Sequence, residues 1–323
     1  MPDFKLTTPV AFIIFNRPDT TELVFAEIAK AKPTKLLVIA DGARANKKGD
    51  AEKVAATRAI INRIDWACEV LTNFSDVNLG CKIRVSSGID WVFEQVEEAI
   101  ILEDDCLPDP TFFRFCQELL EKYRDDQRVG MISGANFQFG QTRNHDSYYF
   151  SNYNIIWGWA SWRRAWKHYD VKATVWPKFR DEDWLTGISH SRGEKEFWDR
   201  SFDAVFSNKI DTWDYQWVLT SMIRGALSVT PNINLISNIG FGPDATHTFG
   251  VSKFSNMEME SINFPLRHPI IFLPDRIADA YVAQSQFIAH SLFDQLRSFI
   301  FLLPVRIIRK ICKFFQYRHN NLG

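Results

Sequence analysis

Residues 99–105 read Ala-Ile-Ile-Leu-Glu-Asp-Asp, an apolar run that stops abruptly at three consecutive carboxylates. The apolar part has the length and composition of a buried β-strand. Like charges crowded at the end of a strand repel one another unless a positive group lies between them. Carboxylate oxygens suit a hard divalent cation such as Mg²⁺ or Mn²⁺, which can share its ligands with a diphosphate. The alternative is an acidic loop that is simply exposed to solvent.

Predicted strands and helices alternate on both sides of this run. Upstream, apolar runs at 10–15, 36–40 and 68–71 are predicted strands separated by helical patterns. Downstream, a helix is predicted from Pro110 to Tyr123, with the proline near its first turn, where a missing N–H costs little. This order predicts an α/β fold in which helices flank a mostly parallel, Rossmann-like sheet.

Polar residues follow three of the predicted strands, at Asn16-Arg17, Asp41-Gly42 and residues 103–105. Ligands of open parallel sheets bind beyond the carboxyl ends of the strands, so we expect these residues to meet in one crevice. No Gly-x-Gly-x-x-Gly pattern follows the first strand, and no Walker A sequence occurs. Dinucleotide enzymes and P-loop NTPases are therefore disfavoured.

Composition narrows the class of ligand further. The net charge of the 323 residues is only −1, which argues against nucleic acid as a partner. The 11 Trp and 27 Phe residues favour aromatic platforms for a ring-shaped ligand. Five cysteines without a Cys-x-x-Cys pair indicate reduced cytosolic thiols. The sequence has neither an N-terminal signal core nor an apolar run long enough to span a bilayer. We therefore expect the protein to lie on the cytoplasmic side of any membrane that it contacts.

The motifs now point to a family. Asn16-Arg17-Pro18 after the first strand, Asp41-Gly42 after the second, and the segment 103–113, Glu-Asp-Asp-Cys-Leu-Pro-Asp-Pro-Thr-Phe-Phe, resemble the GT-A glycosyltransferases. The segment 103–113 is most similar to the N-acetylglucosaminyltransferase I-like branch and to family 2-like bacterial enzymes. The resemblance covers about residues 9–250 and is most specific at 99–116.

This resemblance implies a GT-A fold and a metal-dependent, inverting transfer of a hexosyl or N-acetylhexosaminyl unit. The donor would be a nucleoside diphosphate sugar, with a UDP-sugar favoured. The acceptor would be a glycan or a lipid-linked glycan in surface polysaccharide biosynthesis. Donor base, donor sugar and acceptor stay open at this point.

The resemblance also implies roles for individual residues near the first and fourth strands. Asp105 would bind Mn²⁺ or Mg²⁺ directly, Asp104 would contact the ribose or reach the metal through water, and Glu103 would support the loop. The strand end that includes Phe15, Asn16 and Arg17 would line the base and ribose, and Asp41 would contact the edge of the base.

Two cations follow the turn at residues 78–80. Lys82 and Arg84 lie where a helix is predicted to begin, and a helix N-terminus with cationic side chains suits a diphosphate. The alternative is ordinary surface charge.

An inverting transfer needs a carboxylate near the acceptor hydroxyl as general base. We expect this to be Asp214, which lies between Trp213 and Tyr215. The stretch resembles the Trp-Asp-Asp-Trp element of the related enzymes, with Tyr215-Gln216 in place of the second Asp; Asp211 and Asp244 are reserves. The alternative is an acid on a helix surface.

Aromatic residues predict the acceptor side, and one histidine is a candidate for the donor side. The expected acceptor-binding residues are Trp157, Trp159, Trp213 and Trp217, unless these rings only pack the core. Gly158 would let the backbone approach the ligand. His247 would be a further metal ligand or a phosphate donor, unless it is a solvated loop residue.

The chain divides into a nucleotide-sugar-binding half (1–133), an acceptor-binding half of the same domain (134–282), and a basic tail (283–323). From Gln295 to the end there are six Lys/Arg and no acid. Between 305 and 315 the cations fall on one side of a predicted helix and Val, Ile and Phe on the other. We expect this helix to hold the protein peripherally on the anionic inner leaflet, although packing on the domain is the alternative.

Two other functions stay open. A sugar nucleotidyltransferase usually has a Gly-rich, Arg-containing loop after its first strand, where this chain has Asn16-Arg17-Pro18. A catalytically silent, membrane-associated scaffold that binds nucleotide sugars would keep the same fold. Nucleotide binding without turnover would favour the scaffold.

Overall fold

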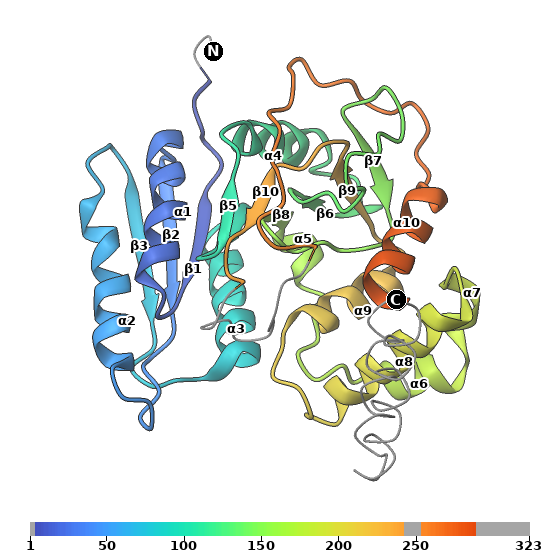
Figure 1. Ribbon diagram of the computed structural model, residues 1–323, viewed down its shortest axis with the longest axis horizontal. Coiled ribbons are helices and arrows are strands. Elements are labelled where there is room, and N and C mark those ends of the chain that lie inside the picture. The colour runs from blue at the N-terminus through green and yellow to red at the C-terminus, as the bar shows by residue number, and fades with distance from the viewer. Residues whose placement is uncertain (1–3, 242–252, 289–323) are drawn as a thin grey trace, which may run out of the picture.

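The structure is a computed structural model that describes residues 4–241 and 253–288. Strands and helices alternate from β1 to β4, and helices α5 to α10 belong to the second half of the chain (Figure 1). In chain order the main elements are β1 (Val10–Ile14), α1 (Pro18–Ala31), β2 (Lys35–Ala40), α2 (Asp50–Ala59), β3 (Glu69–Phe74), α3 (Gly80–Gln95), β4 (Glu98–Glu103), β5 (Cys106–Pro108), α4 (Thr111–Lys122), β6 (Val129–Ser133), β7 (Tyr148–Ser151), β8 (Trp159–Trp162), α5 (Arg163–Trp166), α6 (Trp176–Asp181), α7 (Trp184–Ile188), α8 (Arg192–Phe206), α9 (Asp214–Arg224), β9 (Leu227–Pro231), β10 (Ile236–Asn238) and α10 (Arg276–Val282).

Within the described residues, an 8-stranded sheet has the order β3-β2-β1-β4-β8-β6-β9-β7. Strands β1 to β4 run parallel to one another, and so do β6 and β9. Strand β8 is antiparallel to both β4 and β6, and the edge strand β7 is antiparallel to β9. The predicted mostly parallel, Rossmann-like sheet with flanking helices is confirmed.

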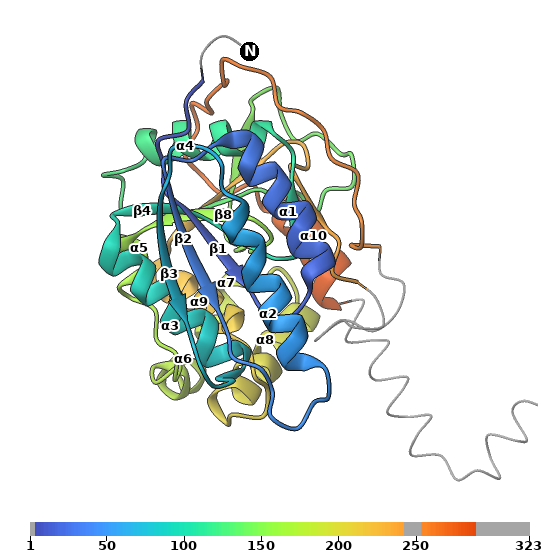
Figure 2. The same cartoon turned by 90° about the vertical axis from the view of Figure 1, so that its left-hand side faces the viewer.

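Alternate residues of β1 serve two hydrophobic cores, one on each face of the sheet. Phe12 packs in the core that includes Phe25 of α1 and Phe112 of α4. Its neighbour Ile13 packs in the other core, together with Ile89 of α3. Figure 2 shows the consequence, with α1 and α2 on one side of the strands and α3 on the other. Successive side chains of a strand point to opposite faces, so a continuous apolar run fits this doubly covered position.

The structure corrects one strand boundary, because the third strand spans Glu69–Phe74 rather than 68–71. In the second half, α8 and α9 are separate helices because the chain turns after α8. There Asn208 adopts a left-handed backbone with φ 54°, and the Lys209 N–H donates to the Ala204 carbonyl at 2.8 Å, which ends the helix.

Both predicted halves contribute strands to the same sheet, β1 to β4 and β6 from the first and β7 to β9 from the second. A short π-helical turn, Ala283–Ile288, continues α10. The predicted amphipathic helix at 305–315 lies outside the described residues. Among the described helices, none combines the length and the apolar character needed to cross a membrane.

Candidate functional site

The loops that follow β1 and β4 meet at the carboxyl ends of these paired strands. The Arg17 guanidinium donates a hydrogen bond to Asp104, and its other terminal nitrogen lies 2.9 Å from a carboxylate oxygen of Asp105. The backbone N–H of Phe15 also donates to Asp104, at 3.2 Å. The structure therefore brings together Phe15 and Arg17 from the first predicted strand end with the acidic residues from the fourth.

Negative charge exceeds positive charge at this point. Burial raises the pKa of Asp104 despite its pairing with Arg17. Burial and the charges of Asp105 and Asp104 raise the pKa of Glu103 to about 8. For Arg17, burial opposes the charged form, but the two carboxylates outweigh it and its pKa is raised. The Arg17 guanidinium thus pairs with two of the three adjacent carboxyl groups, and the raised pKa of Glu103 favours its neutral form at pH 7.

Asp214 lies at the same end of the sheet. It is the first residue of α9, and the hydroxyl of Thr212 donates a hydrogen bond to its carboxylate. The charge of Asp214 is one of those that raise the pKa of Glu103, after burial and the charges of the triplet. The predicted base and the acidic triplet are therefore electrostatic neighbours, although they are more than 100 residues apart in the chain.

The N-terminus of α3 is capped by two carboxylates. Asp41 accepts hydrogen bonds from the backbone N–H groups of Leu79 at 2.9 Å and Gly80 at 3.1 Å. Asp211 accepts the backbone N–H groups of the next two residues, both at 3.0 Å. The four backbone N–H groups at this helix end, which have no acceptor inside the helix, therefore all donate to these two carboxylates. Because its oxygens are held by these internal donors, Asp41 acts here as a helix cap, which differs from the predicted contact to the base.

The two cationic side chains predicted to contact phosphate lie in different surroundings. Lys82 is accessible, and its ammonium lies 2.6 Å from the side-chain oxygen of Asn208. Arg84 is buried and donates to the backbone and side-chain oxygens of Asn73, at 2.8 and 2.7 Å. Arg84 therefore supports the end of β3, and the prediction that it contacts phosphate does not fit its position. Of the two, Lys82 is the more exposed, and it could reach a ligand by exchanging its hydrogen bond to Asn208.

Three of the four predicted acceptor-binding rings lie in the core. Trp159, Trp213 and Trp217 are at most 2% exposed and pack together, with ring centroids 5.7 Å apart for Trp159 and Trp213. The packing alternative therefore holds for them, and they leave no ring face for a sugar. Trp157 is half-buried and packs edge-on against Phe241, with centroids 5.8 Å apart. It is the predicted acceptor-side ring that keeps accessible surface.

The backbone near Trp157 approaches protein rather than an open site. Gly158 has φ 58°, and a Cβ there would lie 2.4 Å from the Ile236 side chain. This residue is therefore glycine because β10 packs closely against it.

Two residues that the sequence analysis missed brace the loop after β1. The buried Asp50, at the start of α2, accepts a hydrogen bond from the Asn16 side chain at 2.5 Å. It also forms an ion pair with Arg44 at 2.7 Å. The Arg44 guanidinium lies 5.1 Å from the centre of the Phe15 ring. Arg44 and Asp50 thus connect the loops after β1 and β2. No sequence spacing links these positions, so only the fold could reveal them.

The segment after β10 covers the acidic triplet. The backbone N–H of Ile239 donates to the Asp105 carbonyl at 2.9 Å. A Cβ on Gly240 would lie 2.1 Å from the Asp105 carboxylate, so only glycine fits this approach without displacement. Residues 242–252, which include Asp244 and His247, lie outside the described residues. Among the described residues, no three His, Cys, Asp or Glu side chains are grouped so that they could hold a metal ion.

Comparison with protein-family models and with curated proteins finds no match. Among solved structures, the chain is similar to 4-diphosphocytidyl-2C-methyl-D-erythritol synthase from Anaerococcus prevotii. The identity is 9% and the TM-score 0.31, over 67% of this chain and 97% of that one. It is also similar to UDP-glucose pyrophosphorylase complexed with UDP-glucose, with 8% identity and a TM-score of 0.35, over 69% of this chain and 90% of that one. Likeness at this level does not assign an activity.

Proposed function

We propose that this chain is a metal-dependent, inverting glycosyltransferase that uses a nucleoside diphosphate sugar, most favourably a UDP-sugar. The observation that carries the proposal is the meeting of Glu103, Asp104 and Asp105 with Arg17 and Asp214 at the carboxyl end of a parallel sheet. This edge is where open α/β sheets bind their ligands. A site with more carboxylates than cations selects a ligand that arrives with a divalent ion, as a nucleoside diphosphate does.

The nucleotide half of the site is formed by the loop after β1. Phe15 offers an aromatic face, and Asn16 and Arg44 are held in place by Asp50. This bracing favours a preorganised contact to base and ribose. Lys82 supplies an accessible cation for the diphosphate. Asp41 and Arg84 contribute indirectly, by fixing the end of α3 and the end of β3.

Carboxylate oxygens are ligands that Mg²⁺ and Mn²⁺ prefer. Asp105 is the proposed direct ligand, with Asp104 acting on the ribose or through water, and His247 is proposed as a further ligand. A divalent cation bound here would neutralise the charge of the diphosphate leaving group. Arg17 keeps Asp104 and Asp105 oriented toward the same place.

Asp214 is the proposed general base. Its carboxylate takes the proton of the acceptor hydroxyl, and the hydroxyl oxygen forms a bond to the anomeric carbon. The bond between that carbon and the diphosphate oxygen breaks on the opposite side, and the nucleoside diphosphate leaves with the electron pair. The hydrogen bond from Thr212 holds the carboxylate in one orientation for this step.

The proposed acceptor is a glycan or lipid-linked glycan of surface polysaccharide biosynthesis. Trp157 is the accessible ring on this side of the site. We further propose that the basic tail holds the protein peripherally on the cytoplasmic face of the membrane, where a lipid-linked acceptor is found.

A sugar nucleotidyltransferase is the second candidate, and UDP-glucose pyrophosphorylase, one of the similar structures, is named for that chemistry. A nucleotidyltransferase needs cations free to contact a nucleoside triphosphate. The cation that follows β1, Arg17, is already paired with two carboxylates, which favours the glycosyltransferase. A scaffold that binds nucleotide sugars without turnover is the third candidate.

The deciding experiment is calorimetric titration with UDP, with and without Mn²⁺, on the wild type, Asp105→Ala and the matched surface variant Asp125→Ala. We expect Mn²⁺-dependent binding that Asp105→Ala abolishes and Asp125→Ala keeps. Absence of binding for UDP, GDP and dTDP alike would contradict the proposal. Formation of pyrophosphate from UTP and a sugar 1-phosphate would identify the nucleotidyltransferase instead.

A further inference from the structure

Residues 270–277 lead into α10 along the outer edge of the molecule (Figure 1). The exposed fractions are 100% for Ile270, 70% for Ile271, 68% for Leu273 and 69% for Ile277. We call these four side chains the 270–277 surface. Scattered exposed apolar residues need no explanation, but four large aliphatic side chains within eight residues mark an interaction site.

The segment beneath this surface is firmly attached to the sheet. The Phe272 ring packs on Phe150 of the edge strand β7, with centroids 4.1 Å apart, and the Arg128 guanidinium lies 3.7 Å from its centre. The Asp275 N–H donates to the Phe150 carbonyl at 2.8 Å. Because side chains alternate along an extended chain, Phe272 faces inward and its two neighbours face outward.

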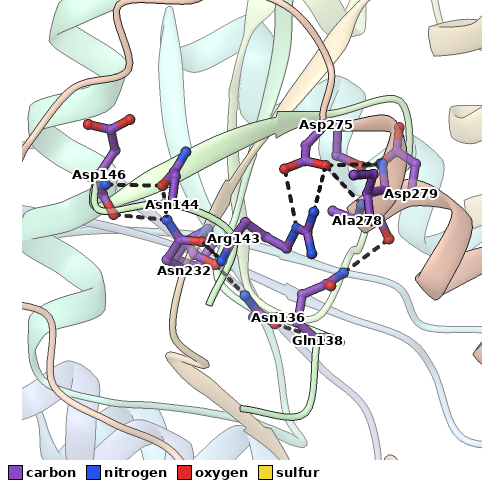
Figure 3. Close-up of polar contacts among 12 residues, drawn as sticks. Asn136, Gln138, Arg143, Asn144, Asp146, Asn232, Asp275, Ala278 and Asp279 are labelled. Carbon is purple, nitrogen blue, oxygen red and sulfur yellow. Dashed lines mark hydrogen bonds and ion pairs between the residues drawn. The ribbon is translucent and has the colours of Figure 1, made fainter. Parts of the chain in front are cut away.

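The start of α10 is anchored in the same way (Figure 3). Asp275 caps the helix by accepting the Ala278 N–H at 3.0 Å, and its carboxylate is also paired with Arg143 at 3.2 Å. The Gln138 side chain donates to the Ala278 carbonyl at 3.1 Å. Asp279 is buried and accepts the Ser151 hydroxyl at 2.6 Å. With these residues turned inward, Ile277 faces outward from a fixed helix.

Positive charge flanks the apolar side chains. Arg267 and Arg276 are both exposed; Arg267 precedes the surface, and Arg276 lies within it, between Leu273 and Ile277. Asp275 is the one acid between residues 267 and 277, and Arg143 neutralises it. An apolar ridge between cations matches the boundary between acyl chains and anionic headgroups.

We propose that the 270–277 surface inserts its isoleucine and leucine side chains into an anionic lipid bilayer, while Arg267 and Arg276 contact lipid phosphates. Ile270 is 100% exposed, and a bilayer accepts exposed aliphatic side chains of this kind without a shaped pocket. The described chain ends 11 residues after Ile277, and its sequence then carries six Lys/Arg and no acid from Gln295 onward. The sequence that follows the described residues therefore carries the positive charge that an anionic bilayer attracts.

This inference does not depend on the proposed transfer reaction, because lipid binding needs no substrate. The test is sedimentation of the full-length protein with vesicles of phosphatidylglycerol and phosphatidylcholine, compared with pure phosphatidylcholine. The variant Ile270→Asp/Leu273→Asp removes two apolar contacts, and Leu23→Asp/Val77→Asp makes the same change at two other exposed sites. We expect the first variant to bind at least tenfold more weakly and the second to bind like the wild type.

Amide hydrogen exchange of residues 267–282 in the unmodified protein gives an independent readout, and we expect anionic vesicles to slow it. Wild-type binding by Ile270→Asp/Leu273→Asp, or exchange unaffected by vesicles, would overturn the proposal. So would a dimer in sedimentation velocity that this variant dissociates, since the surface would then bind a second copy. Without vesicles, faster proteolysis of the tail in this variant than in the wild type would show that the surface binds the tail instead of lipid.

Discussion

The Arg17 guanidinium lies 2.9 Å from the carboxylate of Asp105, the residue proposed to bind the metal. The same guanidinium donates to Asp104, which is buried. Arginine therefore supplies positive charge to a cluster of acids that would otherwise repel one another. It also connects the loop after β1, proposed to contact the nucleotide, to the loop after β4, proposed to bind the metal.

Replacing Arg17 is expected to destabilise the fold through Asp104. In Arg17→Met the buried Asp104 carboxylate loses its partner, which costs about 3 kcal/mol of unfolding free energy. The double variant Arg17→Met/Asp104→Asn should recover most of this loss, because position 104 is then neutral and Asp105, which also loses Arg17, is more exposed than Asp104. Urea denaturation of the four proteins in the cycle measures the coupling. Additive losses would show that the ion pair does not stabilise the protein.

Much of this architecture could be predicted from periodicity. The apolar runs that lead to Arg17, Asp41 and Asp105 predict parallel strands whose carboxyl ends lie at the same edge of the sheet. That rule needs no long-range information, since each run is bounded by its own local sequence. It locates the candidate site within the fold and identifies the acids that crowd there.

What could not be predicted is which polar groups are used inside the protein. Asp211 caps α3 through N–H groups about 130 residues away, and no local pattern reveals this. Arg84 and Lys82 look alike in sequence, but helix periodicity turns Arg84 into the core and leaves Lys82 outside. Trp159 is likewise indistinguishable from a ligand-facing ring until packing is known.

Asp50 should make stability depend on acid pH. Hydrogen bonds from Arg44 hold the pKa of this carboxyl well below its unfolded value of 3.8. Its stabilising contribution is therefore complete above that value and is lost as the pH falls below it. We expect Asp50→Asn to be less stable by about 2 kcal/mol at pH 7 and to show a flatter stability profile between pH 5 and pH 2.

Thermal unfolding across this pH range tests the expectation, with the exposed Asp65→Asn as the matched control. The Asp50→Asn variant also frees Asn16 and Arg44, so UDP binding should weaken even where this variant is folded. Equal acid sensitivity in the wild type and Asp50→Asn would assign the pH dependence to other carboxylates.

Asp214→Asn should lose turnover and keep nucleotide binding. Removing a general base lowers kcat by about 100-fold or more, whereas UDP affinity depends on other groups. The reaction to follow is the hydrolysis of UDP-glucose or UDP-N-acetylglucosamine, with water as acceptor and UDP release as the signal. Asp125→Asn is the control. A variant that retains wild-type kcat would transfer the role to Asp211 or Asp244.

Thr212 is a positioning residue in this scheme, because its hydroxyl donates to the Asp214 carboxylate. Thr212→Val should lower kcat about tenfold with little change in KM, and Thr212→Ser should restore it, since serine keeps the hydroxyl. If Ser and Val variants behave alike, the hydroxyl does not orient the base and the threonine serves packing alone.

Gly240→Ala tests whether the segment after β10 shapes the site. The added Cβ would lie 2.1 Å from the Asp105 carboxylate and 2.8 Å from the Arg17 guanidinium, so one side chain or the segment must move. Folding should suffer by about 1 kcal/mol, as in other overpacked positions. Mn²⁺-dependent UDP binding should fall much further, because the displaced carboxylate is the proposed ligand. Gly187→Ala, where nothing lies within 4 Å of the new Cβ, provides the control. If Gly240→Ala binds UDP and Mn²⁺ like the wild type, the covering segment moves aside freely and Asp105 does not depend on it.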